Sequence, residues 1–157
     1  MDSEDTFLQK IAVFFLMLIL LGVIGFIAYS LDWKNDRVEA PSQLVTINKN
    51  FHNSEHNISS YDDAVEYKII SDKALKNSFI KSHVQFEFSK DAMTMLVEEN
   101  SYRVCQQTIT KLGKLSESGD LVIMVNGKSI KNVVNAESNI DYACAQSGAA
   151  VIKNMRR

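Results

Sequence analysis

An uncharged apolar run from Ile11 to Leu31 constrains this chain more than any other feature. A helix rises about 1.5 Å per residue, so these 21 residues are long enough to span a hydrocarbon core of roughly 30 Å. Lipid offers no hydrogen-bond partners, so the backbone groups of such a segment have to be satisfied within a helix. Tyr29 and Trp33 lie at the far end, where aromatic rings prefer the membrane interface. The run therefore predicts a transmembrane helix.

A cleaved signal peptide and a buried helix of a soluble core are the alternatives to a membrane anchor. Signal peptides have a basic start, a shorter apolar stretch and a small-residue cleavage site. Here the start is acidic, and Ala28-Tyr29-Ser30 is a poor cleavage site. A charge-free run of this length is also rare in a soluble core. We expect a retained anchor that packs against neighbouring anchors, with Gly22 and Gly25 offering small surfaces for close approach. The residues expected to serve anchoring and assembly are Ile11, Phe14, Leu18, Gly22, Gly25, Tyr29 and Trp33.

The two cysteines, Cys105 and Cys144, help to predict on which side of the membrane the polar part of the chain lies. An even pair favours one disulfide in an exported domain, and two buried free thiols in a cytosolic domain are the alternative. A crosslink between them closes a loop of 39 residues, which stabilises a domain by about 4 kcal/mol. The charges give the opposite indication, because Lys34 and Arg37 follow the apolar run whereas only Lys10 precedes it. We favour the disulfide, and with it a cytoplasmic N-terminus and an exported C-terminal domain.

The chain divides into four segments: residues 1–10, the anchor over 11–31, a connecting and partly helical segment over 32–60, and a globular domain over 61–157. In the connecting segment, Pro41 predicts a kink or a break in any continuous helix. Leu44, Ile47 and Phe51 follow a 3–4 spacing and favour a helix that restarts after the proline.

The globular part begins with one expected helix from Tyr61 to Ile80, in which Tyr61, Val65 and Ile69 recur every four residues. Ser60 and Asp63 resemble a capping box at its start. A second, shorter helix is expected from Tyr102 to Leu112, with Cys105 on its inward face and Gly113 as its C-terminal stop.

Period-two alternation and short apolar runs predict the strands of this domain. Val84, Phe86 and Phe88 alternate with polar residues and indicate a half-buried strand. Asn126-Gly127 is a strong hairpin signal between two further strands. The remaining expected strands are Met93–Val97, Leu121–Val125, Lys128–Ile130 and Gly148–Ile152. The fold class predicted is α+β with a mostly antiparallel sheet.

Composition and motifs do not support catalysis. The net charge is −2, with 17 basic and 19 acidic side chains, so no nucleic-acid partner is expected. The sequence His52-Asn-Ser-Glu-His56 matches the H-x-x-E-H pattern of one metallopeptidase class. Its neighbours are poor helix formers and no third ligand is identified, so we interpret both as surface histidines. We expect no catalytic residues, no metal and no cofactor, and a membrane-tethered metallopeptidase stays a remote alternative.

Two stretches of the domain carry a resemblance to a known family. Ser71-Asp-Lys-Ala-Leu-Lys-Asn-Ser-Phe-Ile80 is similar to the segment that ends in Asn-Pro-Phe or Asn-Pro-Trp before the sheet of the type IV pilins. The segment from Val97 through Cys105 to Leu112 resembles their strand, turn and helix with the first cysteine, and Val125-Asn-Gly127 followed by Ala143-Cys144 also fits. The chain therefore resembles type IV pilins, in particular the type IVb class, over about half its length.

The resemblance implies a pilin-like domain with a C-terminal disulfide loop, in a minor or accessory subunit of a type IVb pilus or a related secretion or conjugation system. Its partners would be other pilin subunits or assembly-platform proteins, in homo- or hetero-oligomers at a bacterial inner membrane. The chain departs from the family because Met1–Phe7 has no Gly and Lys10 lies where apolar residues are usual. A bitopic scaffold subunit of the assembly machinery, which never enters a fibre, is the alternative function.

Overall fold

The computed structural model describes residues 2–98, 102–117, 122–135, 137–145 and 149–155. These residues form two units, the first ending at Asn35 and the second beginning at Asp36. In the first unit the described residues belong to one long helix, and they include its apolar part. The second unit is α+β, with a five-stranded antiparallel sheet.

Helix α1 (Asp2–Asn53) continues through Pro41, so of the kink or break predicted at this proline the break is wrong. A proline inside a helix lacks one N–H and costs about 3 kcal/mol or more. Burial of the following turns offsets this cost, because each large apolar side chain that leaves water contributes roughly 1.5–3 kcal/mol. The apolar stripe predicted after the proline is confirmed as helical and buried. Its fully buried members are Leu44, Ile47 and Phe51.

The single helix predicted over residues 61–80 is wrong, because the structure has three short helices there, α2 (Tyr61–Glu66), α3 (Asp72–Lys76) and α4 (Ser78–His83). A polar side chain caps the start of each one. The capping box of Ser60 and Asp63 is confirmed at α2, Ser71 accepts from a backbone N–H at α3, and Asn77 does so at α4. Helix α2 ends at Glu66 with Tyr67 as its C-cap, and the next residue, Lys68, has a φ of 57°. These local caps break the apolar period into separate turns.

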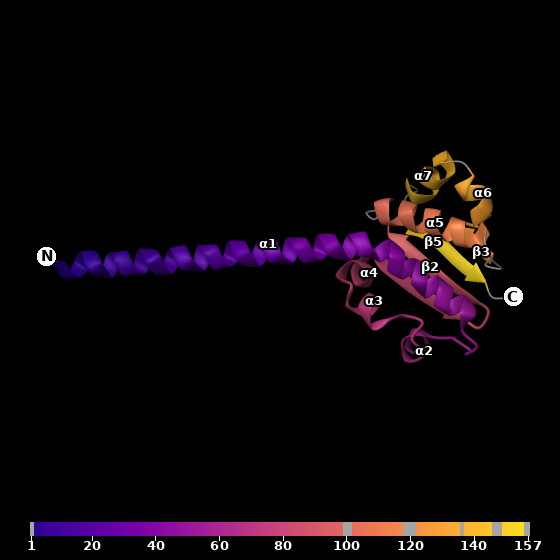
Figure 1. Cartoon of the computed structure of the whole chain (residues 1–157), viewed down its shortest axis with the longest axis horizontal. Coiled ribbons are helices and arrows are strands. Elements are labelled where there is room, and N and C mark those ends of the chain that lie inside the picture. Colours follow the sequence, from indigo (N-terminus) through magenta and orange to yellow (C-terminus); the bar gives the residue numbers. More distant parts are fainter. Residues whose placement is uncertain (1, 99–101, 118–121, 136, 146–148, 156–157) are drawn as a thin grey trace. The chain divides into compact units, whose positions relative to one another are not determined.

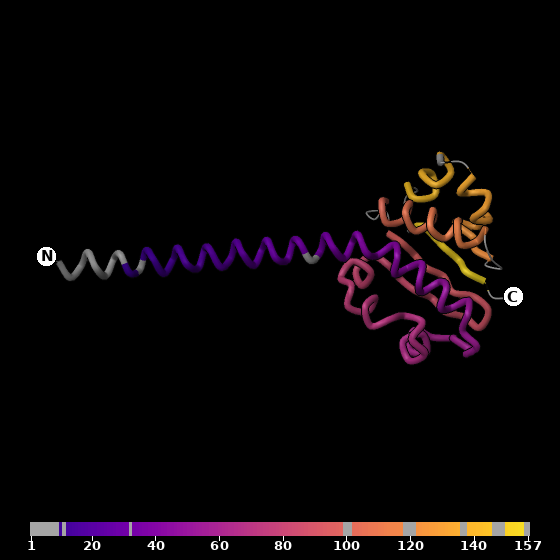
Figure 2. Tube along the Cα trace, in the orientation of Figure 1, coloured from indigo at the N-terminus to yellow at the C-terminus, as the bar shows by residue number. Residues whose placement is uncertain are grey.

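The sheet is built from β1 (Val84–Ser89), β2 (Ala92–Glu98), β3 (Val122–Val125), β4 (Lys128–Ser129) and β5 (Ala149–Met155). Its order is β1-β2-β5-β3-β4, and every neighbouring pair is antiparallel. The last strand, β5, therefore lies in the middle of the sheet beside β2 (Figure 2). In this pairing Met95 is opposite Ile152. The strands predicted at Val84–Phe88, Met93–Val97 and in the C-terminal segment are confirmed.

The Asn126-Gly127 hairpin is confirmed, because both residues have positive φ angles, 48° and 77°, as a tight turn of this kind requires. The strand after it is shorter than predicted, since Ile130 already begins helix α6 (Ile130–Val134). Two predicted strand ends, Leu121 and Gly148, lie outside the described residues.

Helix α5 (Tyr102–Glu117) continues past Gly113, so the predicted stop at this glycine is wrong. The glycine is buried, and a Cβ atom there would lie 2.5 Å from Cγ1 of Val134 in α6. Gly113 therefore permits close packing of two helices rather than the end of one. Helices α6 and α7 (Glu137–Ala145), which cover α5, were not predicted.

The part of α1 from Asp36 onward packs on the sheet and forms the centre of the core. Asn154 of β5 donates to the backbone carbonyl of Asn48 at 3.0 Å. The rings of Phe51 and Phe88 lie 6.1 Å apart and join the same helix to β1. Helices α2–α4 and α5–α7 flank this part of α1 on its two sides (Figure 1).

Candidate functional sites: the apolar helix, the α5–α7 link and a polar groove

The apolar part of α1 is exposed on all its faces. One helix among the described residues is long and apolar enough to cross a membrane, and it is this one. Side chains over residues 12–31 are exposed, including Phe14, Leu18 and Tyr29, and Trp33 also lies at the surface. A helix that is apolar all round needs an apolar environment on every side. The side chain of Ile11 is outside the described part of the structure.

The polar and small residues of this helix fit an apolar environment. The hydroxyl of Ser30 donates to the carbonyl of Phe26 at 2.8 Å, so its polarity is satisfied within the helix. A Cβ atom added at Gly22 or Gly25 would meet no atom within 4 Å. Both glycines therefore present open backbone surface, as the sequence predicted for contact with another helix.

The two cysteines form a disulfide that joins α5 to α7. Cys105 and Cys144 are buried, and their Cα atoms lie 5.8 Å apart. Asp141 of α7 adds two polar links to α5, since it accepts from the hydroxyl of Tyr102 and from the amide of Gln106. The predicted disulfide is confirmed. It links α5, which was expected, to α7, which was not.

Asn126 ties the hairpin to the same region. Its side-chain amide donates to the carbonyl of Ala143 at 3.1 Å, and its Oδ1 accepts from the N–H of Val151 at 2.8 Å. The residue predicted only as a turn former thus also links β3 to α7 and to β5. Sequence reasoning missed this role because both partners are distant in the chain.

The two histidines of the H-x-x-E-H pattern do not lie on one helical face. His52 is in the last turn of α1, which ends at Asn53, whereas His56 lies beyond the helix and stacks on Tyr67 with ring centroids 4.1 Å apart. His56 is exposed and His52 is half-buried. In the described parts of the chain, no three His, Cys, Asp or Glu side chains form a group that could hold a metal ion.

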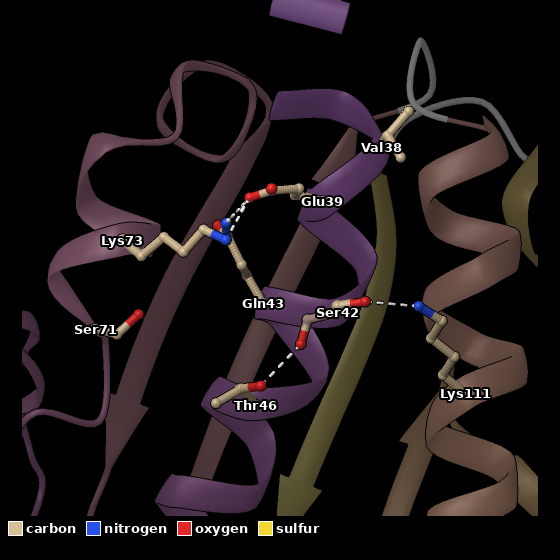
Figure 3. Close-up of a pocket in the computed structure, with 8 residues that line it drawn as sticks. All are labelled: Val38, Glu39, Ser42, Gln43, Thr46, Ser71, Lys73 and Lys111. Carbon is tan, nitrogen blue, oxygen red and sulfur yellow. Dashed lines mark hydrogen bonds and ion pairs between the residues drawn. The ribbon is translucent and has the colours of Figure 1, made fainter. Parts of the chain in front are cut away.

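An open polar groove of about 610 Å³ lies over the outward face of α1, between α3 and α5 (Figure 3). Glu39 Oε2 accepts from Nζ of Lys73 at 2.7 Å and from Nε2 of Gln43 at 3.2 Å. On the other side, Nζ of Lys111 donates to Oγ of Ser42 at 2.7 Å. No sequence signal pointed to this groove, because its walls come from three separated segments. The lining residues are Val38, Glu39, Ser42, Gln43, Thr46, Ser71, Lys73 and Lys111.

Comparisons with protein-family models, with curated proteins and with solved structures find no match to this chain.

Proposed function

We propose that this chain is a pilin-like assembly subunit, minor or accessory rather than the bulk component, of a type IVb pilus or a related secretion or conjugation system. The proposal is carried by the combination of three features in one chain. An apolar helix exposed on all faces continues into a helix that packs on an antiparallel sheet, and a disulfide closes the C-terminal part of that domain.

The mechanism is association rather than catalysis. The apolar helix holds the chain in the membrane and packs against the anchors of neighbouring subunits through its small residues, Gly22 and Gly25. The domain lies on the oxidising side, in the periplasm, where its disulfide persists. This places the N-terminus in the cytoplasm and the domain where it contacts neighbouring pilins or platform proteins.

Single-cysteine labelling of the full chain in cells tests the orientation. A cysteine introduced at Lys90, in the exposed turn between β1 and β2, is expected to react with a membrane-impermeant maleimide in intact cells whose outer membrane is permeabilised. A cysteine at Ser3 is expected to react only after lysis. The reverse pattern would contradict the exported domain.

Fractionation separates the pilin from the scaffold alternative. Recovery of the chain in sheared filaments, together with its membrane pool, is expected for a subunit that enters the fibre. A chain that stays in the membrane fraction under all conditions would contradict the pilin proposal and support the scaffold. Stoichiometric zinc in the purified chain would instead revive the metallopeptidase alternative at His52 and His56.

A further inference from the structure

The polar groove over α1 contains a buried hydrogen-bond acceptor that lacks a donor. Gln43 is 9% exposed, and its Oε1 has no hydrogen-bond partner among the described residues. Its Nε2 is already used by Glu39, which fixes the carbonyl oxygen as the unpaired atom. Buried polar atoms are nearly always paired, and an unpaired one is destabilising. This oxygen has less than 1 Å² of exposed surface, so a ligand reaches it only after the Gln43 amide or a side chain beside it rotates, and an O–H or N–H donor from the ligand would then remove this cost.

The charges that line the groove favour an anion. Two ammonium groups, Lys73 and Lys111, lie on opposite walls (Figure 3), and Glu39 is the one carboxylate among the lining residues. The carboxylate is already shared between Lys73 and Gln43. The hydroxyls of Ser42, Thr46 and Ser71 add small polar groups to the floor and one wall. The groove therefore suits a group with a single negative charge and hydroxyl donors.

We propose that this groove binds the headgroup of an anionic phospholipid that carries hydroxyl groups, such as phosphatidylglycerol. The phosphodiester lies between Lys73 and Lys111, and a headgroup hydroxyl donates to Oε1 of Gln43. Val38, an apolar lining residue that is 69% exposed, provides a surface for the ester-linked end of the lipid. The groove volume of about 610 Å³ lies in the range of small-ligand sites, roughly 300–1,000 Å³.

The inference rests on the proposed membrane anchor, which keeps the groove close to lipid. Val38 follows Leu31 by seven residues, and even a fully extended chain of that length reaches only about 25 Å. The groove is thus tethered near the headgroup layer whatever the arrangement of the two units. The attraction between lysines and an anionic leaflet falls off within about 8 Å at physiological ionic strength, so it acts on Lys73 and Lys111 when the domain lies against the membrane.

Titration of the full chain in zwitterionic detergent with dihexanoyl phosphatidylglycerol, followed by native mass spectrometry, tests the proposal. We expect saturable binding of one lipid, at least about tenfold weaker in the double variant Lys73→Ala/Lys111→Ala. The matched control is Lys90→Ala/Lys131→Ala, which removes the same charge from exposed positions outside the groove and is expected to bind like the wild type. Gln43→Met, which keeps the length and removes the acceptor, is expected to weaken binding about tenfold.

Two soluble probes identify the source of the anion. Dihexanoyl phosphatidylcholine lacks hydroxyl donors and inorganic phosphate lacks the lipid, so both are expected to bind at least about tenfold more weakly. Equal binding of inorganic phosphate, or unchanged binding in the Lys73/Lys111 double variant, would overturn the proposal. A chain that floats with liposomes but does not bind phosphatidylglycerol would overturn this inference alone, whereas a chain that fails to float would contradict the anchor and the proposed function with it.

Discussion

The two parts of helix α1 are both rich in apolar residues, yet their side chains meet opposite surroundings. Leu16 is 63% exposed, whereas Leu44, in the part from Asp36 onward, is fully buried. The later part alternates apolar and polar positions, so one face packs on the sheet and the other carries the polar groove. The earlier part is apolar all round and needs lipid or other helices around it. One helix thus has a part suited to lipid and a part suited to the core of a domain in water. The distribution of polar residues along the helix determines which part suits which environment.

Loss of the disulfide should give the largest effect and act on the domain alone. For the double variant Cys105→Ala/Cys144→Ala we expect a decrease in the free energy of unfolding of about 4 kcal/mol, because the 39-residue loop is no longer closed in the unfolded chain. Urea unfolding of the chain in mild detergent, followed by near-ultraviolet circular dichroism, measures it. Flotation with liposomes should be unchanged. An equal unfolding midpoint with and without reductant would contradict this prediction.

A matched pair of leucine truncations compares the two parts of α1 directly. Leu44→Ala removes a fully buried side chain and should lower the free energy of unfolding of the domain by about 3 kcal/mol. Leu18→Ala removes an exposed side chain in the apolar part and should leave domain unfolding unchanged. The same urea experiment serves for both variants. Similar losses in the two variants would mean that the domain also depends on the apolar part.

A matched pair of glycine substitutions compares the same two regions, with a smaller expected change in the free energy of unfolding. Gly113→Ala places a methyl group 2.5 Å from Cγ1 of Val134, and we expect a loss of about 1 kcal/mol after the better helix propensity of alanine is included. The additional change Val134→Ala should relieve the clash. Gly22→Ala meets no atom within 4 Å and should leave the domain unaffected while weakening contacts between anchors in the membrane, measured by crosslinking. A Gly113→Ala variant as stable as the wild type would contradict the close packing of α5 and α6.

The smallest expected effect is a pH dependence at the start of α2. The backbone N–H and hydroxyl of Ser59, and then the hydroxyl of Ser60, lower the pKa of Asp63 below its ordinary value of 3.8. A carboxyl group with a lowered pKa in the folded state contributes stability above its ordinary pKa, and this contribution is lost as the pH falls through the folded-state value. Asp63→Asn should therefore be slightly less stable than the wild type at pH 7, and in urea titrations the two should converge as the pH falls through the lowered pKa of Asp63. A difference that grows toward acid pH would contradict the assignment.

Features with a strong local signal could be predicted from the sequence. The strand alternation around Phe86, the Asn126-Gly127 turn and the capping box at Ser60 depend on neighbouring residues, and all three are confirmed. The cysteine pairing could be predicted because only two cysteines are present. The helix through Pro41 and the continuation of α5 past Gly113 could not, because burial against distant segments outweighs the local preference there. The polar groove belongs to the same group, since it exists only when α1, α3 and α5 are packed together.

The sequence alone is sufficient to assign one helix suited to lipid and one α+β domain with a pair of cysteines able to form a crosslink. Unbroken apolarity, two-residue alternation and the number of cysteines are local or countable properties, and they need no knowledge of the packing. The packing of distant segments is what places β5 at the centre of the sheet, brings α7 to the disulfide and buries Gln43 with an unpaired carbonyl. These outcomes depend on contacts between residues far apart in the chain, whose free energies add up only once the core has formed.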